Sequence, residues 1–557
     1  MPAQTDRTAL MSPLEPRRLM SFTAVGRETV LPGVGSGAYD VAVAAGGASW
    51  VASVSVVRSG SLQRDVNVLT VQGYDALGRP LGGPMVVTRY AQPGAGVAID
   101  ANPAGQAVVA YVERRGDVEV LTTRQISPGG GGEAGENPPR RLFRRPAGRN
   151  DGDYQSAIGG VAISMTNAGG YFVAYRSADV NKLLVQYVGP DANATPNVIT
   201  ALDVTDGIGG DDEAIGASDI AARPDGSGAV FATTVTGAGD GIAYGTVSTT
   251  AKTGEDGRLI AGSDANSPAV AIAADNGFVI TYNDNTLADN FGGAGTAAQR
   301  FDAAGASKGA PIRLESGLPT GDGPSESLGT SVAATNDGGF VVAFGSYVED
   351  GNDIEPGPAF ARRFAADGTP DESGLITLSQ GNAYGSAAID VDAYGNALVA
   401  YAKAGRTGLS GIDRSVGLRR ITGGILVDHF EAYVVGTNGD DVIRVDAPVN
   451  NRVRVTVNHT TRLLPVAYVG AISVAGLGGN DRIDVNHAMP ATISGGAGAD
   501  TVFGSDAIDL IRGDDGEDRL YGNGGNDTLI GGRGSDFLRG GAGDDDLRGE
   551  ANDVKIA

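Results

Sequence analysis

The C-terminal 63 residues repeat with a period of nine, and this period limits the fold more than any other feature of the chain. From Gly495 the sequence reads GGAGADTVF, GSDAIDLIR, GDDGEDRLY, GNGGNDTLI, GGRGSDFLR and GGAGDDDLR. Every unit has Asp at its sixth position and an aliphatic residue at its eighth. A fixed short period is typical of a solenoid, in which each repeat adds one strand to a continuous core. A flexible Gly/Asp tail would not keep an aliphatic residue in register six times.

The chemistry of these turns indicates calcium. Calcium takes roughly six to eight hard oxygen ligands at flexible angles. A Gly-rich turn exposes its backbone carbonyls and brings the sixth-position carboxylate round to them. The candidate carboxylate ligands are Asp500, Asp509, Asp518, Asp527, Asp536 and Asp545.

The unit resembles the RTX (hemolysin-type) calcium-binding nonapeptide, Gly-Gly-x-Gly-x-Asp-x-aliphatic-x. The resemblance implies a parallel β-roll whose turns stack two repeats apart and share calcium ions, with up to four sites. One stack would contain Asp500, Asp518 and Asp536, and the other would contain Asp509, Asp527 and Asp545. The glycines of the turns that carry the sites are Gly495, Gly498, Gly513, Gly516, Gly522, Gly525, Gly531, Gly534, Gly540 and Gly543.

Some units depart from the pattern. Asp514 and Asn523 stand at second positions, where both residue types tolerate the left-handed backbone. The turn at Gly504 has Ala507 in place of glycine and Ile508 at the fifth position, so we expect its ion to be weak or missing. The ending GEANDVKIA is one residue short, and we expect it to be a frayed cap.

Upstream of the roll, a turn-then-strand unit recurs seven times, as in IDANPAGQAVVAYV and VAATNDGGFVVAF. A second hairpin often follows, so each unit predicts four strands. Seven units predict a β-propeller over residues 21–425. A row of separate β-sandwiches is the alternative, but a sandwich needs about 100 residues. The marker glycines are Gly47, Gly105, Gly169, Gly226, Gly277, Gly338 and Gly395.

The rest of the chain completes an all-β architecture. Residues 1–20 are expected to be a disordered tail, and the stretch 28–31 an outer strand that completes the last blade. Residues 426–494 contain two isolated nonapeptide copies, from Gly436 and Gly476, and predict a short irregular β-helix. Residues 495–557 are expected to form the calcium-binding β-roll. The predicted order is therefore a seven-bladed β-propeller, an irregular β-helix and a C-terminal parallel β-roll.

Two further resemblances are short or general. LEPRRLM, from Leu14, is similar to a Leu-Glu-Pro-Arg motif found near the N-termini of large planctomycete proteins. The phrases GGFVVAF and FARRFAADGT resemble repeats found beside calcium-binding nonapeptides in large bacterial surface proteins. The resemblances to RTX repeats and to bacterial surface proteins imply a secreted protein at the cell surface or outside the cell.

Charge limits the partners. The formal net charge of the chain is −24, which argues against nucleic acid. Residues 495–557 hold 14 acidic and 6 basic residues. The chain contains no run of 18 apolar residues, so the sequence predicts no membrane span. Five Arg between Arg140 and Arg149 fall in a Gly/Pro-rich insertion that we interpret as a solvated loop, and TDGIGGDDEAIG from Thr205 is interpreted as a second loop.

Catalysis is not indicated. The chain has no Cys, and its His residues, His429, His459 and His487, lie outside the predicted propeller and form no HExxH pair. We predict no catalytic residue, although paired carboxylates could still act in a propeller channel. Two functions stay open. The first is an extracellular or cell-surface calcium-binding protein whose propeller binds a surface polysaccharide or a protein. The second is a secreted propeller enzyme that acts on polysaccharide and uses the roll for folding and export.

Overall fold

The computed structural model describes the chain from residue 23 to residue 556, with gaps. The gaps are residues 32–37, 60–63, 76–79, 93–94, 127–137, 147–157, 178–181, 192–194, 204–213, 237–240, 251–257, 261–264, 274, 285–294, 315–323, 351–352, 380–382, 393–394, 406–412, 423–424, 429–430, 450–451 and 466–468. The predicted N-terminal tail with its LEPRRLM motif and most of the TDGIGGDDEAIG loop lie outside the described residues. The regular elements that the described residues form are all β-strands.

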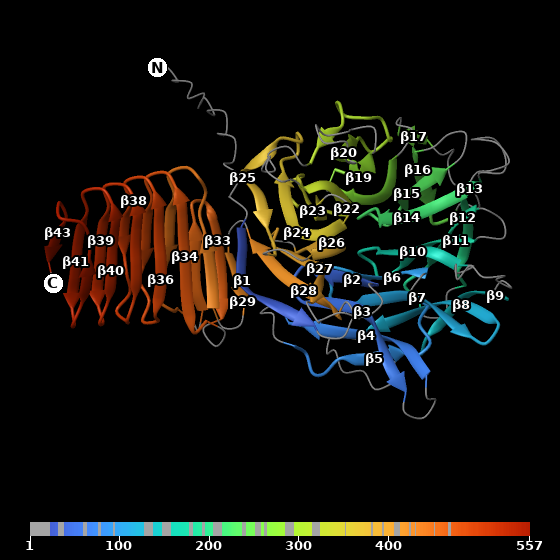
Figure 1. The fold of residues 1–557 in the computed structure, drawn as a ribbon, viewed down its shortest axis with the longest axis horizontal. Helices are drawn as coiled ribbons and strands as arrows, with labels where there is room; N and C mark the ends of the chain where they lie inside the picture. The colour runs from blue at the N-terminus through green and yellow to red at the C-terminus, as the bar shows by residue number, and fades with distance from the viewer. Residues whose placement is uncertain are drawn as a thin grey trace, which may run out of the picture.

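Seven antiparallel four-stranded sheets form a closed ring (Figure 1). The first strand of each blade contacts the first strand of the next, and β26 contacts β2 to close the circle. From inner to outer strand, blade 1 is β2 (Tyr39–Val43), β3 (Ser49–Ser59), β4 (Arg64–Tyr74) and β5 (Met85–Thr88), and blade 2 is β6 (Val97–Ala101), β7 (Ala107–Arg115), β8 (Val118–Ile126) and β9 (Arg140–Pro146). In the same order, blade 3 is β10 (Ile158–Met165), β11 (Tyr171–Ser177), β12 (Lys182–Val188) and β13 (Asn197–Asp203); blade 4 is β14 (Ala214–Ala222), β15 (Gly228–Thr236), β16 (Gly241–Ser248) and β17 (Arg258–Ile260); and blade 5 is β18 (Ala265–Ile272), β19 (Phe278–Asp284), β20 (Gly295–Phe301) and β21 (Ile312–Arg313). Blade 6 is β22 (Pro324–Ala334), β23 (Phe340–Asp350), β24 (Asp353–Phe364) and β25 (Pro370–Thr377), and blade 7 is β26 (Ala383–Val391), β27 (Ala397–Gly405), β28 (Asp413–Thr422) and β1 (Thr23–Leu31). The predicted propeller is confirmed, and the alternative of separate sandwiches is wrong.

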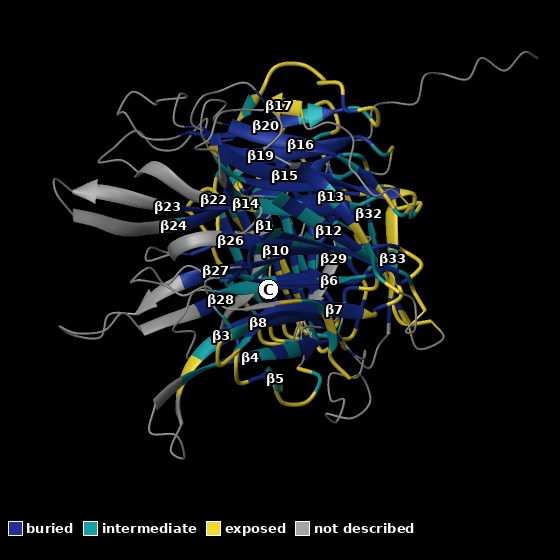
Figure 2. Cartoon of the chain, turned by 90° about the vertical axis from the view of Figure 1, so that its right-hand side faces the viewer, coloured by how far each residue is buried: buried dark blue, intermediate teal, exposed yellow. Residues whose placement is uncertain are grey.

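The core of the propeller lies between the blades. The middle strands β15 and β19 are buried along nearly their whole length (Figure 2). Their side chains alternate between the two faces of a blade, so each blade packs against both of its neighbours. The single Trp of the chain, Trp50 on β3, is fully buried between blades 1 and 2.

The marker turns explain the recurring glycines. Six of the seven marker glycines have φ between 72° and 89°, a left-handed conformation that costs glycine little. The turn of blade 5 differs from the prediction. There Asn276, with φ 61°, takes the left-handed position in place of Gly277. Asn is one of the few other residues that tolerate this conformation, so the turn keeps its geometry.

The ring is closed by the N-terminal strand. β1 pairs antiparallel with β28, with Leu31 opposite Val416 and Thr23 opposite Thr422. It thereby becomes the outer strand of blade 7. The prediction that this part of the chain completes the last blade is confirmed, and the strand begins earlier than predicted, at Thr23.

One prediction about the insertions is wrong. Arg140–Pro146 was interpreted as part of a solvated loop, but it forms β9, the outer strand of blade 2. Two apolar side chains within the Arg-rich run explain this. Leu142 and Phe143 pack against a buried cluster shared with blade 3, and the ring of Phe143 lies 5.4 Å from that of Tyr175.

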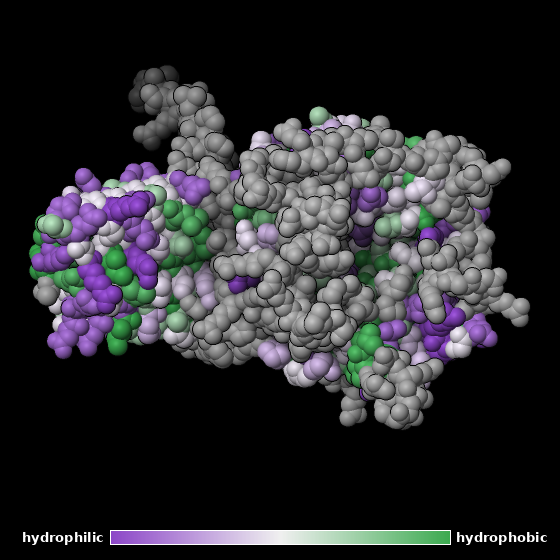
Figure 3. All heavy atoms as spheres, in the orientation of Figure 1, coloured by the Kyte–Doolittle hydropathy of each residue, from purple (hydrophilic) through white to green (hydrophobic). Residues whose placement is uncertain are grey.

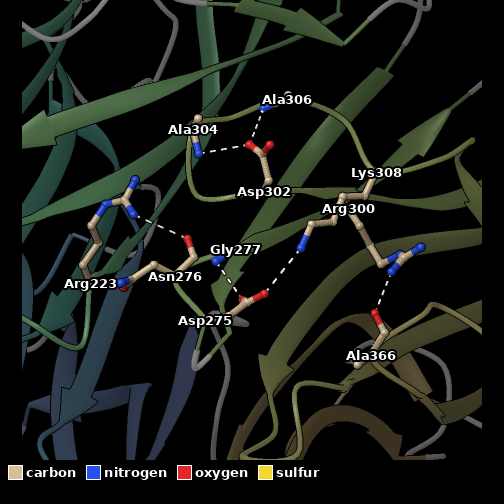
Figure 4. Close-up of polar contacts among 10 residues, drawn as sticks. All are labelled: Arg223, Asp275, Asn276, Gly277, Arg300, Asp302, Ala304, Ala306, Lys308 and Ala366. Carbon is tan, nitrogen blue, oxygen red and sulfur yellow. Dashed lines mark hydrogen bonds and ion pairs between the residues drawn. The ribbon is translucent and has the colours of Figure 1, made fainter.

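Polar side chains also join neighbouring blades near their turns (Figure 4). Arg223 of blade 4 donates to the carbonyl of Asn276 in blade 5, at 3.4 Å. Arg300 of blade 5 donates to the carbonyl of Ala366 in blade 6, at 2.6 Å. Such bonds fix the blade turns relative to one another.

The C-terminal part of the chain is a two-sheet solenoid that begins beside β1 and extends away from the propeller (Figure 1). Its later strands pair in parallel, whereas β29–β30 and β31–β32–β33 pair antiparallel and make the first part irregular. One sheet runs β29 (Ile425–Asp428), β30 (Glu431–Val435), β34 (Ala471–Gly478), β36 (Ala491–Ala497), β38 (Leu510–Asp515), β40 (Thr528–Arg533) and β42 (Asp546–Arg548); the other runs β33 (Thr460–Pro465), β32 (Arg452–Val457), β31 (Val442–Val445), β35 (Arg482–Val485), β37 (Thr501–Phe503), β39 (Arg519–Gly524), β41 (Phe537–Ala542) and β43 (Val554–Ile556). The predicted irregular β-helix and parallel β-roll are confirmed.

Candidate calcium site in the β-roll

A column of aliphatic side chains holds the turns of the roll in place. The eighth-position residues Val502, Ile511, Leu520, Leu529 and Leu538 are fully buried in one core cluster. Leu547 at the end is partly buried. Because each unit places one such side chain inward, the chain crosses from one sheet to the other at every repeat, and every second turn lies on the same side, one layer further along the solenoid. This register stacks the sixth-position aspartates.

The aspartates are linked in two ladders of hydrogen bonds. On one side, the backbone N–H of Asp500 donates to Oδ1 of Asp518 at 2.8 Å, and that of Asp518 to Oδ1 of Asp536 at 3.0 Å. On the other side, Asp509 donates to Asp527 at 2.9 Å, and Asp527 to Asp545 at 3.0 Å. The prediction that turns two repeats apart stack in these two sets is confirmed.

The second carboxylate oxygen of most of these aspartates has no hydrogen-bond partner among the described residues. Within the described residues, Oδ2 of five predicted aspartates is buried and has no hydrogen-bond partner. These five are Asp500, Asp518, Asp527, Asp536 and Asp545. A buried, unpaired carboxylate oxygen is costly, so a native structure normally supplies a partner, which can be an ion.

In two of these turns the unpaired oxygen lies near a backbone carbonyl of the next stacked turn. A Cβ atom built on Gly513 would clash with both Oδ2 of Asp518 and the carbonyl oxygen of Gly531. Gly522 shows the same arrangement with Asp527 and Gly540. Since the described residues bring no three His, Cys, Asp or Glu side chains together at one point, an ion here would need such carbonyls. Hard carboxylate and carbonyl oxygens are the ligand set that calcium prefers, so the residues fit this ion.

The electrostatics of the stacks also favour a cation. Burial raises the pKa of Asp518 to about 7, and repulsion from Asp500 and Asp536 adds to the effect. Burial likewise raises the pKa of Asp527 to about 6, with repulsion from Asp509 and Asp545. A bound cation would remove the repulsion that raises these pKa values. In the view of Figure 3, hydrophilic side chains gather over the outer surface of the same roll.

The turns need residues that accept positive φ. Asp514 and Asn523 have φ of 73° and 75°, as the sequence predicts for second positions. At the fourth position, a Cβ atom on Gly516 would clash with the carbonyl oxygen of Gly498. Only glycine allows this close approach of successive turns.

The turn at Gly504 differs, but for a reason that we did not predict. The backbone N–H of Ser505 donates to Oδ2 of Asp509 at 2.6 Å, and its hydroxyl donates to Oδ1 at 2.9 Å. Both oxygens of Asp509 therefore have protein partners. The structural reason to expect a weak or missing ion at this turn is therefore Ser505, and not Ala507 or Ile508 as we predicted.

Three aspartates were missed. Asp481, from the copy at Gly476, donates its N–H to Oδ1 of Asp500 at 2.8 Å and accepts from the N–H of Asp441 at 2.8 Å. The copies described as isolated thus continue the first stack. At the other end, Asp536 donates to Oδ1 of Asp553 at 3.0 Å, and β43 pairs with β41. The expectation of a frayed end is wrong, because the short repeat still places Asp553 in the stack. For Asp441 and Asp481 the available signal was the sixth position of each copy, whereas Asp553 is the fifth residue of the short last copy.

Comparison with known proteins agrees with this geometry. Residues 494–529 and 521–553 match the model of the RTX calcium-binding nonapeptide repeat. This segment consists of RTX calcium-binding repeats. No curated protein matches the chain.

Solved structures similar to the chain are distant. They include the polysaccharide lyase Uly1, at 9% identity and a TM-score of 0.41, covering 74% of this chain and 94% of that one. An α-L-arabinofuranosidase from Fusarium graminearum matches at 10% identity and a TM-score of 0.37, covering 59% and 94%. A protein of unknown function from Dyadobacter fermentans matches at 13% identity and a TM-score of 0.39, covering 62% and 98%. At these TM-scores the likenesses say nothing about the activity of this chain.

The described part of the chain contains no helix long and apolar enough to cross a membrane.

Proposed function

We propose that this chain is an extracellular or cell-surface calcium-binding protein, in which the RTX roll folds around calcium and the propeller is an interaction scaffold. The observation that carries the proposal is the row of buried, unpaired Oδ2 atoms, of which those of Asp518 and Asp527 lie near a carbonyl of the next stacked turn.

The proposed ligands are the sixth-position carboxylates together with backbone carbonyls of the turns. The carboxylates are Asp500, Asp518, Asp527, Asp536 and Asp545. The sixth predicted carboxylate, Asp509, is not included because Ser505 already donates to both of its oxygens. The carbonyls come from the turns that contain Gly495, Gly498, Gly513, Gly516, Gly522, Gly525, Gly531, Gly534, Gly540 and Gly543. Calcium supplies positive charge and flexible coordination to these oxygens, and its role is structural.

Calcium binding would be coupled to folding. Each repeat buries one aliphatic side chain at its eighth position, whereas ordering the backbone costs about 1–2 kcal/mol per residue. The roll also places carboxylates above one another, which repel without a counter-ion. The free energy of ion binding then becomes free energy of folding.

A location outside the cell suits this coupling. Extracellular calcium modules bind their ions at about 10⁻⁴–10⁻³ M, so they are filled outside the cell and empty inside it. A net charge of −24 and the absence of Cys are compatible with that location. The resemblance to bacterial surface proteins supports it as well.

The polar interior of the propeller favours a scaffold over an enzyme. Asp40, Asp100, Asp219 and Asp390 lie on inner strands of the ring. Asp40 accepts the N–H of Ile99 in the next blade at 2.9 Å, and Asp390 accepts that of Val43 at 2.6 Å, across the junction of the last and first blades. These carboxylates therefore join blades, and this use accounts for them without catalysis.

A glycan array combined with a screen for polysaccharide cleavage distinguishes the two proposed functions. The scaffold proposal expects binding of a polysaccharide or protein without bond cleavage. Cleavage activity that stays with the purified protein and is lost after Asp→Asn substitution in the propeller would support the alternative, a secreted polysaccharide-acting enzyme.

A further inference from the structure

The complete turns of the roll and its connector, from Gly436 to Gly540, fall into two conformational classes, distinguished by their second residue. The shorter last turn at Gly549 belongs to neither class: its second residue, Glu550, has no positive φ, although Oδ2 of Asp553 is unpaired among the described residues. In most turns the second residue has positive φ, and the sixth-position Oδ2 is unpaired among the described residues. These second residues are Leu477, Gly496, Asp514, Asn523, Gly532 and Gly541. In two turns the second residue is a hydroxyl residue, Thr437 or Ser505, and neither has positive φ within the described chain.

The two hydroxyl turns share one hydrogen-bond pattern. Thr437 donates its N–H to Oδ2 of Asp441 at 2.6 Å, as Ser505 does to Asp509. The hydroxyl of Thr437 adds a bond to the same oxygen of Asp441 at 3.0 Å. Each hydroxyl also accepts the N–H of the fourth residue, Gly439 or Ala507, at 3.0 Å. The donors therefore bind the carboxylate oxygen, Oδ2, that is unpaired in the turns of the first class.

The turn at Gly476 belongs to the other class, although it precedes the segment that matches the RTX model. Asp481 is nearly fully buried, and its Oδ2 lacks a hydrogen-bond partner in the described structure. A Cβ atom on Gly476 would clash with this oxygen and with the carbonyl oxygen of Gly495. The same pair of oxygens meets at Gly513 and Gly522 inside the RTX segment, and also in the two hydroxyl turns at Gly436 and Gly504. The unpaired Oδ2 is therefore what places the turn at Gly476 with the first class.

We propose that the second residue of each turn decides whether the turn takes an ion: Asp481 binds a calcium ion at the junction of connector and roll, whereas Asp441 and Asp509 hold none. This inference rests on the proposed calcium binding of the roll. A hydroxyl turn stands at the start of each aspartate ladder, with Asp441 beginning one and Asp509 the other. These turns are closed by the protein itself, so they give the ion-dependent turns an ordered surface to stack on without calcium.

The test counts calcium ions bound to the full chain at a fixed millimolar concentration of free calcium, by equilibrium dialysis and elemental analysis. Asp481→Asn lowers the count by one ion relative to the unsubstituted chain. Its matched control, Asp509→Asn, leaves the count unchanged. The double substitution Ser505→Gly with Ala507→Gly raises the count by one, because it restores glycine at both special positions and removes the hydroxyl donor.

The outcomes distinguish a failure of the proposed calcium binding from a failure of the inference about the second residue. If the unsubstituted chain binds no calcium, the proposed function fails. If it binds calcium but Asp509→Asn removes an ion, or Asp481→Asn removes none, the inference about the second residue is overturned. The double substitution guards against misfolding, since a gain of one ion cannot come from an unfolded roll. A double variant that is folded by hydrogen exchange and binds no additional ion also overturns the inference.

Discussion

The backbone N–H of Asp518 donates to Oδ1 of Asp536, 3.0 Å away, while Oδ2 of Asp536 has no partner among the described residues. One oxygen of each carboxylate therefore holds the next turn in register, and the other is available to an ion. A single residue type at one position of the nonapeptide performs both tasks. This relationship makes the loss of an inner aspartate more damaging than the loss of one at the end.

Asp518→Ala should weaken the calcium-induced folding of the roll more than Asp545→Ala. Asp518 has a stacked turn on both sides, whereas Asp545 ends its ladder. A bond to a charged group contributes about 1.5–3 kcal/mol, so the calcium concentration at the midpoint should rise by about tenfold or more for Asp518→Ala. Circular dichroism during a calcium titration measures this midpoint. Equal midpoints for the two variants would contradict the shared-ion arrangement.

Gly513→Ala should prevent the calcium-bound roll from forming at that turn, because its Cβ atom would clash with Oδ2 of Asp518 and with a backbone carbonyl. Gly524→Ala is the matched control in the same roll. Its Cβ atom would meet its nearest neighbours at 3.7 Å, an ordinary contact. Calorimetry should show fewer ions bound by the first variant and an unchanged number bound by the second. Similar losses in both would show that the clash at Gly513 is not the cause.

The N-terminal strand should be needed for a stable ring. Deleting residues 1–31 removes β1 and leaves β28 with an unpaired edge, which invites association of chains. Deleting residues 1–22 keeps β1 and serves as the control. Light scattering after gel filtration should find aggregates for the first deletion and monomers for the second. A longer deletion that stays monomeric with an unchanged melting temperature would refute the role of β1.

The propeller should be more stable at pH 5 than at pH 8. Burial raises the pKa of Asp40 to about 7 and that of Asp219 to about 6, from an ordinary value of 3.8. Between pH 4 and 7 the folded state therefore binds more protons than the unfolded state, so its stability falls as pH rises and levels off above the folded pKa. Melting in chelator, followed by fluorescence of the buried Trp50, should shift down by a few degrees from pH 5 to pH 8. Asp219→Asn should reduce this shift, and a melting temperature that rises towards pH 8 would contradict the assignment.

The sequence predicted those parts of the structure that follow from a fixed period. Six aliphatic residues at nine-residue spacing define the inward column, and the same spacing places the aspartates in two stacks. Asp481 was missed as a member because it lies 19 residues before Asp500 and not 18, and no complete nonapeptide lies between the two. β9 was missed because a Gly/Pro-rich sequence precedes it, while its two apolar side chains find their partners only in blade 3.

The sequence predicted only part of what the second residue of each turn does. Left-handed backbone at Asp514 and Asn523 follows from residue type and was predicted. The replacement of an ion by Ser505 depends on how one N–H and one hydroxyl point at Asp509. That direction is set by backbone torsion angles, which the sequence pattern does not display.

The central claim is that calcium folds the roll and leaves the propeller unchanged. Hydrogen exchange of the full chain, measured in chelator and after addition of millimolar calcium, tests it most directly, with Trp50 fluorescence as an internal probe of the propeller. We expect residues 495–556 to exchange rapidly in chelator and to become protected cooperatively with calcium but not with magnesium, which demands strict octahedral geometry. Trp50 fluorescence should not change. A roll that is already protected in chelator, or that gains no protection at millimolar calcium, would contradict the account.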